Sequence, residues 1–117
     1  MTEEQLAEQV ERFYARVRED EVLGPIFNGA ITDWPHHLEK LKAFWSSVML
    51  TSGRYKGSPM AAHLQHRDAI APEMFERWLG LWRTTADQVF VPAEADAIVE
   101  KAERIAESLG LALFFRV

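Results

Sequence analysis

The chain contains no cysteine among its 117 residues. It therefore cannot form a disulfide, bind an iron–sulfur cluster, ligate a metal through thiolate, or attach a prosthetic group covalently through a Cys-x-x-Cys-His motif. A basic excess is also absent, because the net charge is −5 and the pI is about 5.3. This acidity argues against a nucleic acid or an anionic membrane as a partner.

Long hydrophobic runs are missing as well. No apolar stretch approaches the roughly 20 residues that a transmembrane helix needs, and the first residues, Met-Thr-Glu-Glu, do not resemble a signal peptide. Together with the lack of cysteine, this leads us to expect a cytoplasmic protein. The remaining composition is 48% hydrophobic and 26% charged, which suits one core and a single domain spanning residues 1–117.

The hydrophobic residues that are present recur with helical spacing in every long segment. The first stripe consists of Leu6, Val10, Phe13, Tyr14 and Val17. Thr2 and Gln5 form a capping box at the start of this helix. Gly24-Pro25 predicts its end, with Ile26 and Phe27 in a short turn.

A second helix is predicted to begin at a cap formed by Thr32 or Asp33, with Pro35 in its first turn, and to end near Gly53. Its inner face consists of Trp34, Leu38, Leu41, Phe44 or Trp45, and Val48. The choice between the two adjacent aromatic residues stays open at this point.

Pro72 and Pro92 predict the starts of a third and a fourth long helix. The inner face of the third consists of Phe75, Trp78, Leu79, Trp82, Ala86 and Val89. Gly110 marks an end or a bend of the fourth. No segment of useful length alternates with period two, so we expect an all-α fold of about four main helices plus short ones.

One of the four histidines follows an ordered run, Tyr55-x-Gly57-x-Pro59-x-x-x-His63. Gly57 suits a turn, and Pro59 suits the first turn of a short helix. The residues between Pro59 and His63 are Met-Ala-Ala, which carry no charge, so the imidazole can face an apolar cavity. Such a setting suits the axial ligand of a flat apolar cofactor.

The other histidines suggest two further hypotheses. His63 and His66 are spaced so that both could lie on one helical face and form half of a zinc site, completed by Asp68 or a distant carboxylate. His36 and His37 are adjacent, and residues about 100° apart on a helix cannot both face a cavity. The apolar stripe places His37 inward and His36 toward solvent.

Tyr14 and Trp78 lie on the apolar stripes of different helices. A buried phenol or indole N–H needs a hydrogen-bond partner. That partner could be a backbone carbonyl, or both donors could converge with a histidine on a bound diatomic ligand. Aromatic residues make up 11% of the chain, and they could either pack against each other or wall a flat apolar ligand.

These residues occur in the order found in group III truncated haemoglobins, and the chain resembles that family over residues 8–109. Single motifs of this kind are weak, but five in order with helical context are specific. The matching stretches are Phe13-Tyr14-x-x-Val17-Arg18-x-Asp20-x-x-Leu23-Gly24-Pro25-Ile26-Phe27, Trp34-x-x-His37, Phe44-Trp45, Tyr55-x-Gly57-x-Pro59-x-x-x-His63 and Phe75-x-x-Trp78-Leu79.

The resemblance implies a truncated globin with helices arranged two-over-two around haem b. His63 is similar to the family's proximal iron ligand, Tyr14 to its distal tyrosine and Trp78 to its distal tryptophan. Phe27 resembles the phenylalanine that packs on the haem face. His37 resembles a histidine above the pocket that can swing as a gate.

The resemblance also implies that Leu41 faces the distal pocket and restricts its size, and that Phe44, Tyr55 and Trp78 contact the cofactor. The chain departs from the expected pattern after the proximal histidine, over residues 65–71, which include an additional histidine and charged residues.

The implied function is reversible binding of O₂ or another small diatomic ligand by haem b, with Tyr14, Trp78 and His37 acting on the ligand. Such a polar pocket suits redox chemistry on O₂, NO or peroxide, with peroxidase-like or NO-dioxygenase-like turnover supported by a separate electron donor, better than O₂ transport. Two alternatives from other classes stay open: a metal-free helical interaction module, and a small non-haem metalloprotein that uses His63 and His66.

Overall fold

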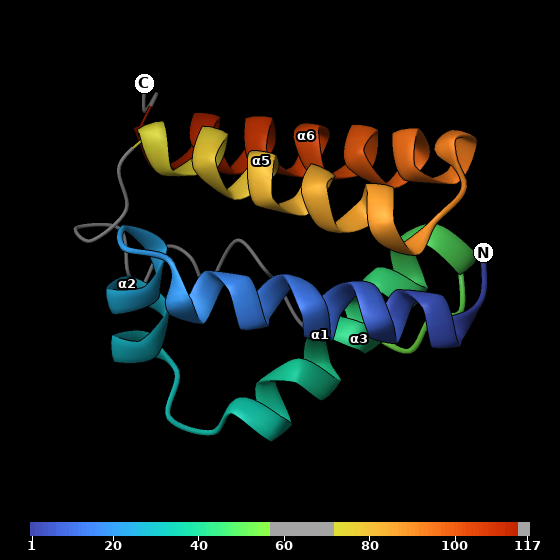
Figure 1. Cartoon of the computed structure of the whole chain (residues 1–117), viewed down its shortest axis with the longest axis horizontal. Helices are drawn as coiled ribbons and strands as arrows, with labels where there is room; N and C mark the ends of the chain where they lie inside the picture. Colours follow the sequence, from blue (N-terminus) through green and yellow to red (C-terminus); the bar gives the residue numbers. More distant parts are fainter. Residues whose placement is uncertain (57–71, 115–117) are drawn as a thin grey trace.

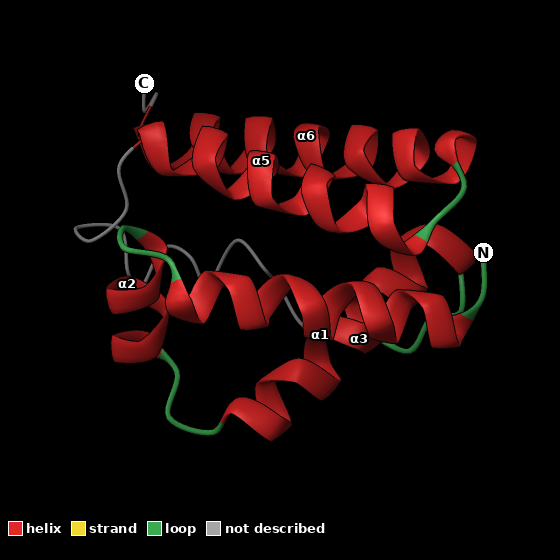
Figure 2. Cartoon of the chain, viewed as in Figure 1, coloured by secondary structure: helices red, strands yellow, loops and turns green. Residues whose placement is uncertain are grey.

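The computed structural model describes residues 1–56 and 72–114, most of which are helical (Figure 1). The helices are α1 (Glu3–Glu19), α2 (Leu23–Ala30), α3 (Trp34–Leu50), α5 (Pro72–Val89) and α6 (Pro92–Phe114). These residues contain no strand (Figure 2), which confirms the expected all-α fold. Within the same residues, no helix combines the length and the hydropathy that crossing a membrane requires.

The helices pack in two layers. α5 and α6 lie side by side and antiparallel in one layer, and α1 runs alongside α5 in the other (Figure 1). α2 and α3 both pack against α1. The core lies between the layers, because the stripes predicted from the sequence face one another there. Its wholly buried side chains include Phe13, Trp45 and Trp82.

Most helix starts lie where the sequence places them. The capping box is formed: the Thr2 hydroxyl accepts the Gln5 N–H at 3.1 Å, and the Gln5 side chain accepts the Thr2 N–H at 3.0 Å. Asp33 caps α3 by accepting the His36 N–H at 3.2 Å, which decides between Thr32 and Asp33. α5 and α6 begin at the predicted prolines.

The prediction that Gly24-Pro25 ends the first helix, with Ile26 and Phe27 in a turn, is wrong. α1 already ends at Glu19, and α2 begins at Leu23. Pro25 then lies in the first turn of α2, where a missing N–H costs no intrahelical hydrogen bond. Phe27 is therefore a helical residue.

The prediction of an end or bend at Gly110 is not supported as an end, because α6 continues to Phe114. A glycine inside a helix weakens it without necessarily ending it. α3 ends at Leu50, and Thr51 after it adopts a left-handed backbone with φ of 53°. That conformation ends the helix before Gly53 is reached.

Gly24 lies where α1 and α2 meet with almost no space between them. A Cβ at this position would lie 2.8 Å from the carbonyl oxygen of Arg18 and 3.3 Å from that of Val17. Both atoms belong to the backbone and cannot move without shifting α1. The site therefore requires glycine for its small size.

We expect Gly24→Ala to lower the free energy of unfolding by about 1–3 kcal/mol, because overpacking forces a backbone shift. Gly80→Ala is the matched control, since a Cβ there meets no atom within 4 Å. That exchange should raise stability by about 0.5–1 kcal/mol through helix propensity. Urea unfolding of both variants measures the effects, and the same sign for both would contradict the close approach.

Asp20 connects the α1–α2 corner to α5. Its carboxylate accepts the backbone N–H groups of Val22 and Leu23 at 3.0 and 2.8 Å, and the Arg77 Nε at 2.7 Å. The hydrogen bond with Arg77 is the largest cause that holds the pKa of Asp20 at about 2, below its ordinary value of 3.8. Arg77 is the residue before Trp78 on α5, and Asp20 lies in the turn between α1 and α2. The ion pair therefore holds the part of α5 that carries Trp78 against the turn that follows α1, the helix of Tyr14.

A lowered pKa means that the ionised Asp20 stabilises the fold above about pH 4, and that this stabilisation is lost as pH falls toward about 2. We expect Asp20→Asn to cost about 1–2 kcal/mol at neutral pH and to flatten the acid limb of the stability profile. Glu100→Gln is the control, because the Glu100–Arg104 pair is exposed and should contribute less than about 0.5 kcal/mol. Urea unfolding as a function of pH measures both, and equal profiles would contradict the role of Asp20.

Candidate functional site

Tyr14 lies at the centre of an aromatic cluster formed by α1, α2 and α3. Its side chain is only 5% exposed. Its ring lies 5.9 Å from Phe27 of α2, 5.9 Å from Trp34 of α3 and 6.1 Å from His37 of α3, measured between centroids. The guanidinium of Arg18 stacks over Trp34 at 4.7 Å and covers that ring on the outside. The phenol is therefore held within a largely apolar surround.

Trp78 of α5 reaches the same phenol. Burial raises the pKa of Tyr14 above its ordinary value, and hydrogen bonding with the Trp78 side chain opposes that rise. An indole N–H can only donate, so Trp78 can offer its N–H to the phenol oxygen or to a ligand beside it, and the phenol keeps its own O–H to donate. The prediction that Tyr14 and Trp78 converge from different helices is thus supported by their contact, and Tyr14 stays a neutral donor.

His37 is partly buried and His36 is exposed, as the stripe on α3 predicts. The His37 ring meets Tyr14 and Trp34 edge to face, at interplanar angles of 88° in both cases. It lies in the first turn of α3, directly after the Asp33 cap. His37 therefore stands at the edge of the Tyr14 cluster, where the helix begins.

One face of α3 leads from this cluster to a cavity between α3 and α6. His37, Leu41, Phe44 and Val48 follow one another on that face at helical spacing. Leu41 and Phe44 are both partly buried against the core, whereas Trp45 is almost wholly buried in it. Phe44, and not Trp45, therefore faces the cavity, and its ring also contacts Tyr55 at 5.2 Å.

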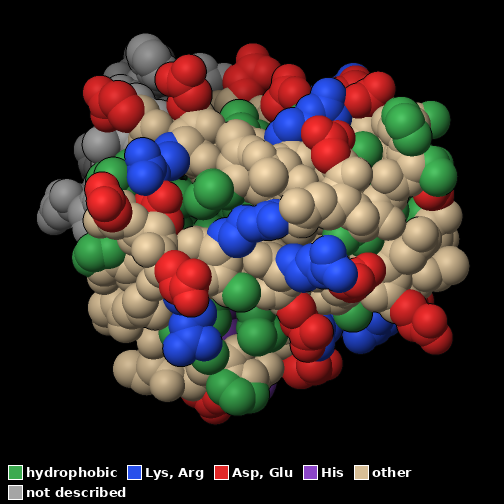
Figure 3. Space-filling view, in the orientation of Figure 1, with side chains coloured by type: hydrophobic (Ala, Val, Ile, Leu, Met, Phe, Trp, Pro, Cys, Tyr) green, Lys and Arg blue, Asp and Glu red, His purple; other side chains and the backbone are tan. Residues whose placement is uncertain are grey.

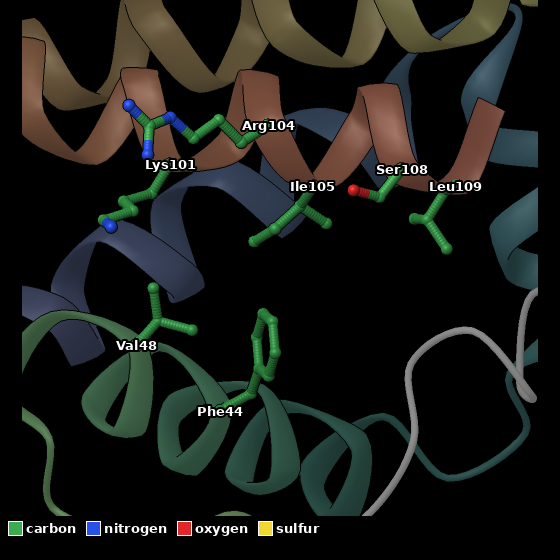
Figure 4. Close-up of a pocket in the computed structure, with 7 residues that line it drawn as sticks. All are labelled: Phe44, Val48, Lys101, Arg104, Ile105, Ser108 and Leu109. Atoms are coloured by element: carbon green, nitrogen blue, oxygen red, sulfur yellow. The ribbon is translucent and has the colours of Figure 1, made fainter. Parts of the chain in front are cut away.

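The cavity has a volume of about 390 Å³ (Figure 4). Phe44 and Val48 point toward α6, and Ile105 and Leu109 point back toward α3 (Figure 4). The remaining lining residues are Lys101, Arg104 and Ser108 of α6. An apolar interior with two cations beside it suits a flat hydrophobic group that carries carboxylates.

His63 and His66 lie outside the described residues, as do Gly57 and Pro59 of the same motif. The proposed axial ligand and its zinc-binding alternative therefore rest on the sequence. Among residues 1–56 and 72–114, no three histidine, aspartate or glutamate side chains come together in a way that could hold a metal ion.

The face of the molecule seen in Figure 3 carries acidic and basic side chains that are interspersed. Exposed ion pairs occur both between helices and along one helix, such as Arg83–Asp96 and Arg12–Glu8. Such a mixed surface does not concentrate either sign of charge on this face.

Comparisons with known proteins identify the family. A model of the bacterial-like globins matches residues 2–110. The group 3 truncated haemoglobin Ctb of Campylobacter jejuni is 36% identical over 110 residues, covering 91% of this chain and 86% of that protein. This chain belongs to the group III truncated haemoglobins. The crystal structure of a group III truncated haemoglobin from Campylobacter jejuni superposes with a TM-score of 0.89 at 35% identity, over 97% of this chain and 92% of that one.

The truncated globin fold expected from the sequence is therefore confirmed. Membership of a haemoglobin family implies haem as the cofactor and a small diatomic molecule as the ligand. The described residues of this globin fit such a group. Their apolar walls, the two cations of α6, the buried Tyr14 and the partly buried Trp78 match a flat macrocycle with carboxylates and a polar ligand.

Sequence reasoning missed two features of this region. Lys101 and Arg104 line the cavity, yet on the sequence they are ordinary charged residues of an amphipathic helix. The Asp20–Arg77 pair also gave no separate signal, because the partners lie 57 residues apart. Asp20 does, however, lie three residues before Leu23, and this is the spacing at which an aspartate side chain accepts a backbone N–H at the start of a helix.

Proposed function

We propose that this globin binds haem b with His63 as the axial ligand and holds a diatomic ligand or peroxide beside Tyr14 and Trp78. The observation that carries the proposal is the approach of the partly buried Trp78 to the buried phenol of Tyr14. Haem supplies the iron that binds the ligand and exchanges electrons with it. The chain supplies the hydrogen bonds, the apolar enclosure and the access route.

Tyr14 and Trp78 both donate toward a ligand that carries partial negative charge. Tyr14 stays protonated because its pKa is raised by burial, so the O–H remains available at any physiological pH. Hydrogen bonds are stronger in a site that excludes water. At about 1–2 kcal/mol each, one such donor slows ligand loss by about five- to thirtyfold.

A pocket with two coupled donors retains O₂ too strongly for transport. We therefore propose redox chemistry on O₂, NO or peroxide, of the peroxidase or NO-dioxygenase type, with electrons from a separate donor. Leu41 and Phe27 limit the space around the ligand, and Phe44 and Tyr55 contribute to the walls of the haem site.

Absorption spectra of the purified protein test this proposal directly. The ferric protein should show the intense band of haem at the blue edge of the visible, and the ferrous protein should shift that band on addition of CO. A protein without any such band would instead be the metal-free module. Metal without haem, found by elemental analysis, would support the site at His63 and His66.

His37 serves as a gate in this proposal and not as a donor to the ligand. Its place in the first turn of α3 gives the side chain room to move, because helix ends open more readily than helix centres. A gate controls how fast ligands enter and leaves the bound state almost unchanged.

We expect His37→Leu to change the CO association rate and to leave the O₂ dissociation rate within about threefold, since loss of a direct hydrogen bond would cost at least about 1 kcal/mol. Flash photolysis and stopped-flow mixing measure the two rates. The exposed neighbour provides the control, because His36→Leu should change neither. An O₂ dissociation rate that rises as much as in Tyr14→Phe would contradict the gate and make His37 a donor.

A further inference from the structure

Three of the four tryptophans form a continuous stack of indole rings. Trp78 and Trp82 lie one turn apart on α5, with centroids 5.8 Å apart and planes inclined by 7°. Trp82 then stacks on Trp45 of α3 at 4.5 Å and 26°. The stack starts at the residue that contacts Tyr14 and passes through the centre of the core, where Trp82 and Trp45 are 0% and 2% exposed.

The stack leads toward Tyr55, beyond the end of α3. Trp45 contacts the ring of Phe44 at 5.5 Å, and Phe44 contacts the ring of Tyr55 at 5.2 Å. Tyr55 is partly exposed, and its backbone N–H donates to the Ser47 hydroxyl at 2.9 Å, which holds it beside α3. Oxidisable rings therefore extend from the Tyr14–Trp78 pair to Trp45, and one phenylalanine ring, that of Phe44, separates Trp45 from the partly exposed Tyr55.

The indole pairs differ in geometry from the other ring contacts of this core. Aromatic pairs pack either edge to face or offset and parallel, and Phe13 meets Tyr14, Trp78 and Trp82 edge to face, at 82–88°. The pairs Trp78–Trp82 and Trp82–Trp45, in contrast, are near-parallel. Tryptophan and tyrosine are also the side chains that give up one electron most easily, and short steps between touching rings are fast.

The hydrogen bonds of the stack favour passage of an electron over reaction of the rings. The Trp82 N–H donates to the carbonyl oxygen of Ile98 at 3.4 Å, and the indole of Trp78 lies beside the phenol of Tyr14. Neither a carbonyl nor a neutral phenol is a base that can take the indole proton. An oxidised indole therefore keeps its proton and is readily reduced again by its neighbour. Tyr55, at the surface, can release its phenolic proton to water.

We propose that Trp78, Trp82 and Trp45 conduct single electrons from Tyr55 at the surface to the pocket beside Tyr14. This inference rests on the proposed redox function, with peroxide as the oxidant. Hydrogen peroxide takes up two electrons and two protons and leaves as two water molecules. Each electron comes from the Tyr55 phenol, which loses its proton to solvent, and an external phenol then returns one electron and one proton to Tyr55. Two phenols are thus oxidised to phenoxyl radicals for each peroxide reduced.

Freeze-quench electron paramagnetic resonance tests the route in the haem-loaded ferric protein mixed with hydrogen peroxide. The unmodified protein should form a tyrosyl radical that is absent from Tyr55→Phe. Trp82→Phe and Trp45→Phe, each of which keeps an aromatic ring but removes an easily oxidised one, should lower that radical at least tenfold. Trp34→Phe is the matched control, because Trp34 contacts Tyr14 but lies outside the stack, and it should retain the Tyr55 radical.

A second measurement needs no substitution in the core. Peptide mass spectrometry of the unmodified protein, treated with peroxide and a spin trap, should locate the adduct on Tyr55. Adducts confined to Trp34 or Tyr14 would overturn the route. A Tyr55 radical that persists in both Trp82→Phe and Trp45→Phe would also overturn it, because Phe44 and Tyr55 belong to the proposed walls of the haem site and Tyr55 would then be oxidised directly across them. If peroxide leaves the haem absorption spectrum unchanged, both the proposed peroxide chemistry and the electron route are contradicted. If the spectrum changes but no Tyr55 radical forms, only the electron route is contradicted.

Discussion

Replacing His63 by glycine should remove most of the haem from the purified protein, and added imidazole should restore the spectrum by occupying the vacated position. We expect this because His63, in the run Tyr55-x-Gly57-x-Pro59-x-x-x-His63, resembles the proximal ligand of the family. A neutral imidazole binds iron through one nitrogen and is oriented through the other. Haem content and the ferrous spectrum, with and without imidazole, measure the effect.

His66→Ala is the matched control for this experiment, because His66 is the other histidine in this part of the sequence that could bind the iron. It should retain haem and an unchanged ferrous spectrum. Normal haem content in His63→Gly would contradict the assignment of His63 as the iron ligand. Loss of haem in both variants would point to a role for the segment as a whole, and the imidazole rescue would then distinguish ligation from folding.

The second large effect should appear in the rate of O₂ dissociation. Tyr14→Phe and Trp78→Phe should each raise it by about five- to thirtyfold, as the loss of a hydrogen bond of about 1–2 kcal/mol to a charged acceptor implies. Phenylalanine preserves most of the ring packing of Tyr14 against Phe27 and Trp34. The change therefore isolates the hydroxyl group.

The two substitutions should not be additive. Trp78 hydrogen-bonds with Tyr14 itself, so removing either partner also releases the other to reorient. Residues that share one hydrogen-bond network show interaction energies of about 0.5–3 kcal/mol in double-mutant cycles. Stopped-flow rates for both single variants and the double variant give this value directly.

Trp34→Phe separates hydrogen bonding from packing in the same assay. Trp34 contacts the Tyr14 ring but shows no hydrogen bond with its phenol, so its replacement should leave the O₂ dissociation rate within about threefold. An unchanged rate in both Tyr14→Phe and Trp78→Phe would mean that the donors face away from the ligand. The proposed pocket would then be misplaced.

Several features of the fold could be predicted because they depend on local chemistry. α5 and α6 begin at Pro72 and Pro92 as expected, because a helix tolerates proline in its first turn but not in its interior. The inward position of His37 and the outward position of His36 follow from the rotation per residue. For Tyr14 and Trp78 the sequence left open whether each donor meets a backbone carbonyl or whether the two converge, and their proximity was decided by the packing of α1 and α5.

The structure differs from the sequence-based predictions where a local sequence feature is compatible with two different structures. Gly24-Pro25 resembles a helix end, but proline serves equally well in the first turn of a following helix. Gly24 is there because α1 leaves no room for a Cβ, which is a contact between two helices. Gly110 is likewise only a weak point inside α6, and the sequence cannot distinguish a weakened helix from an interrupted one.

The sequence by itself determined the all-α class, the inner faces of the helices and the resemblance to the group III truncated haemoglobins, whereas the role of His63 stays a prediction. These depend on periodicity and on residue type at fixed spacing. Only the tertiary structure decided that Phe44 faces the cavity while Trp45 joins the indole stack, and that Asp20 holds Arg77 of α5. Adjacent residues on a helix differ by about 100° in direction, so the crossing of α3 with α5 and α6 is what selects the partner of each ring.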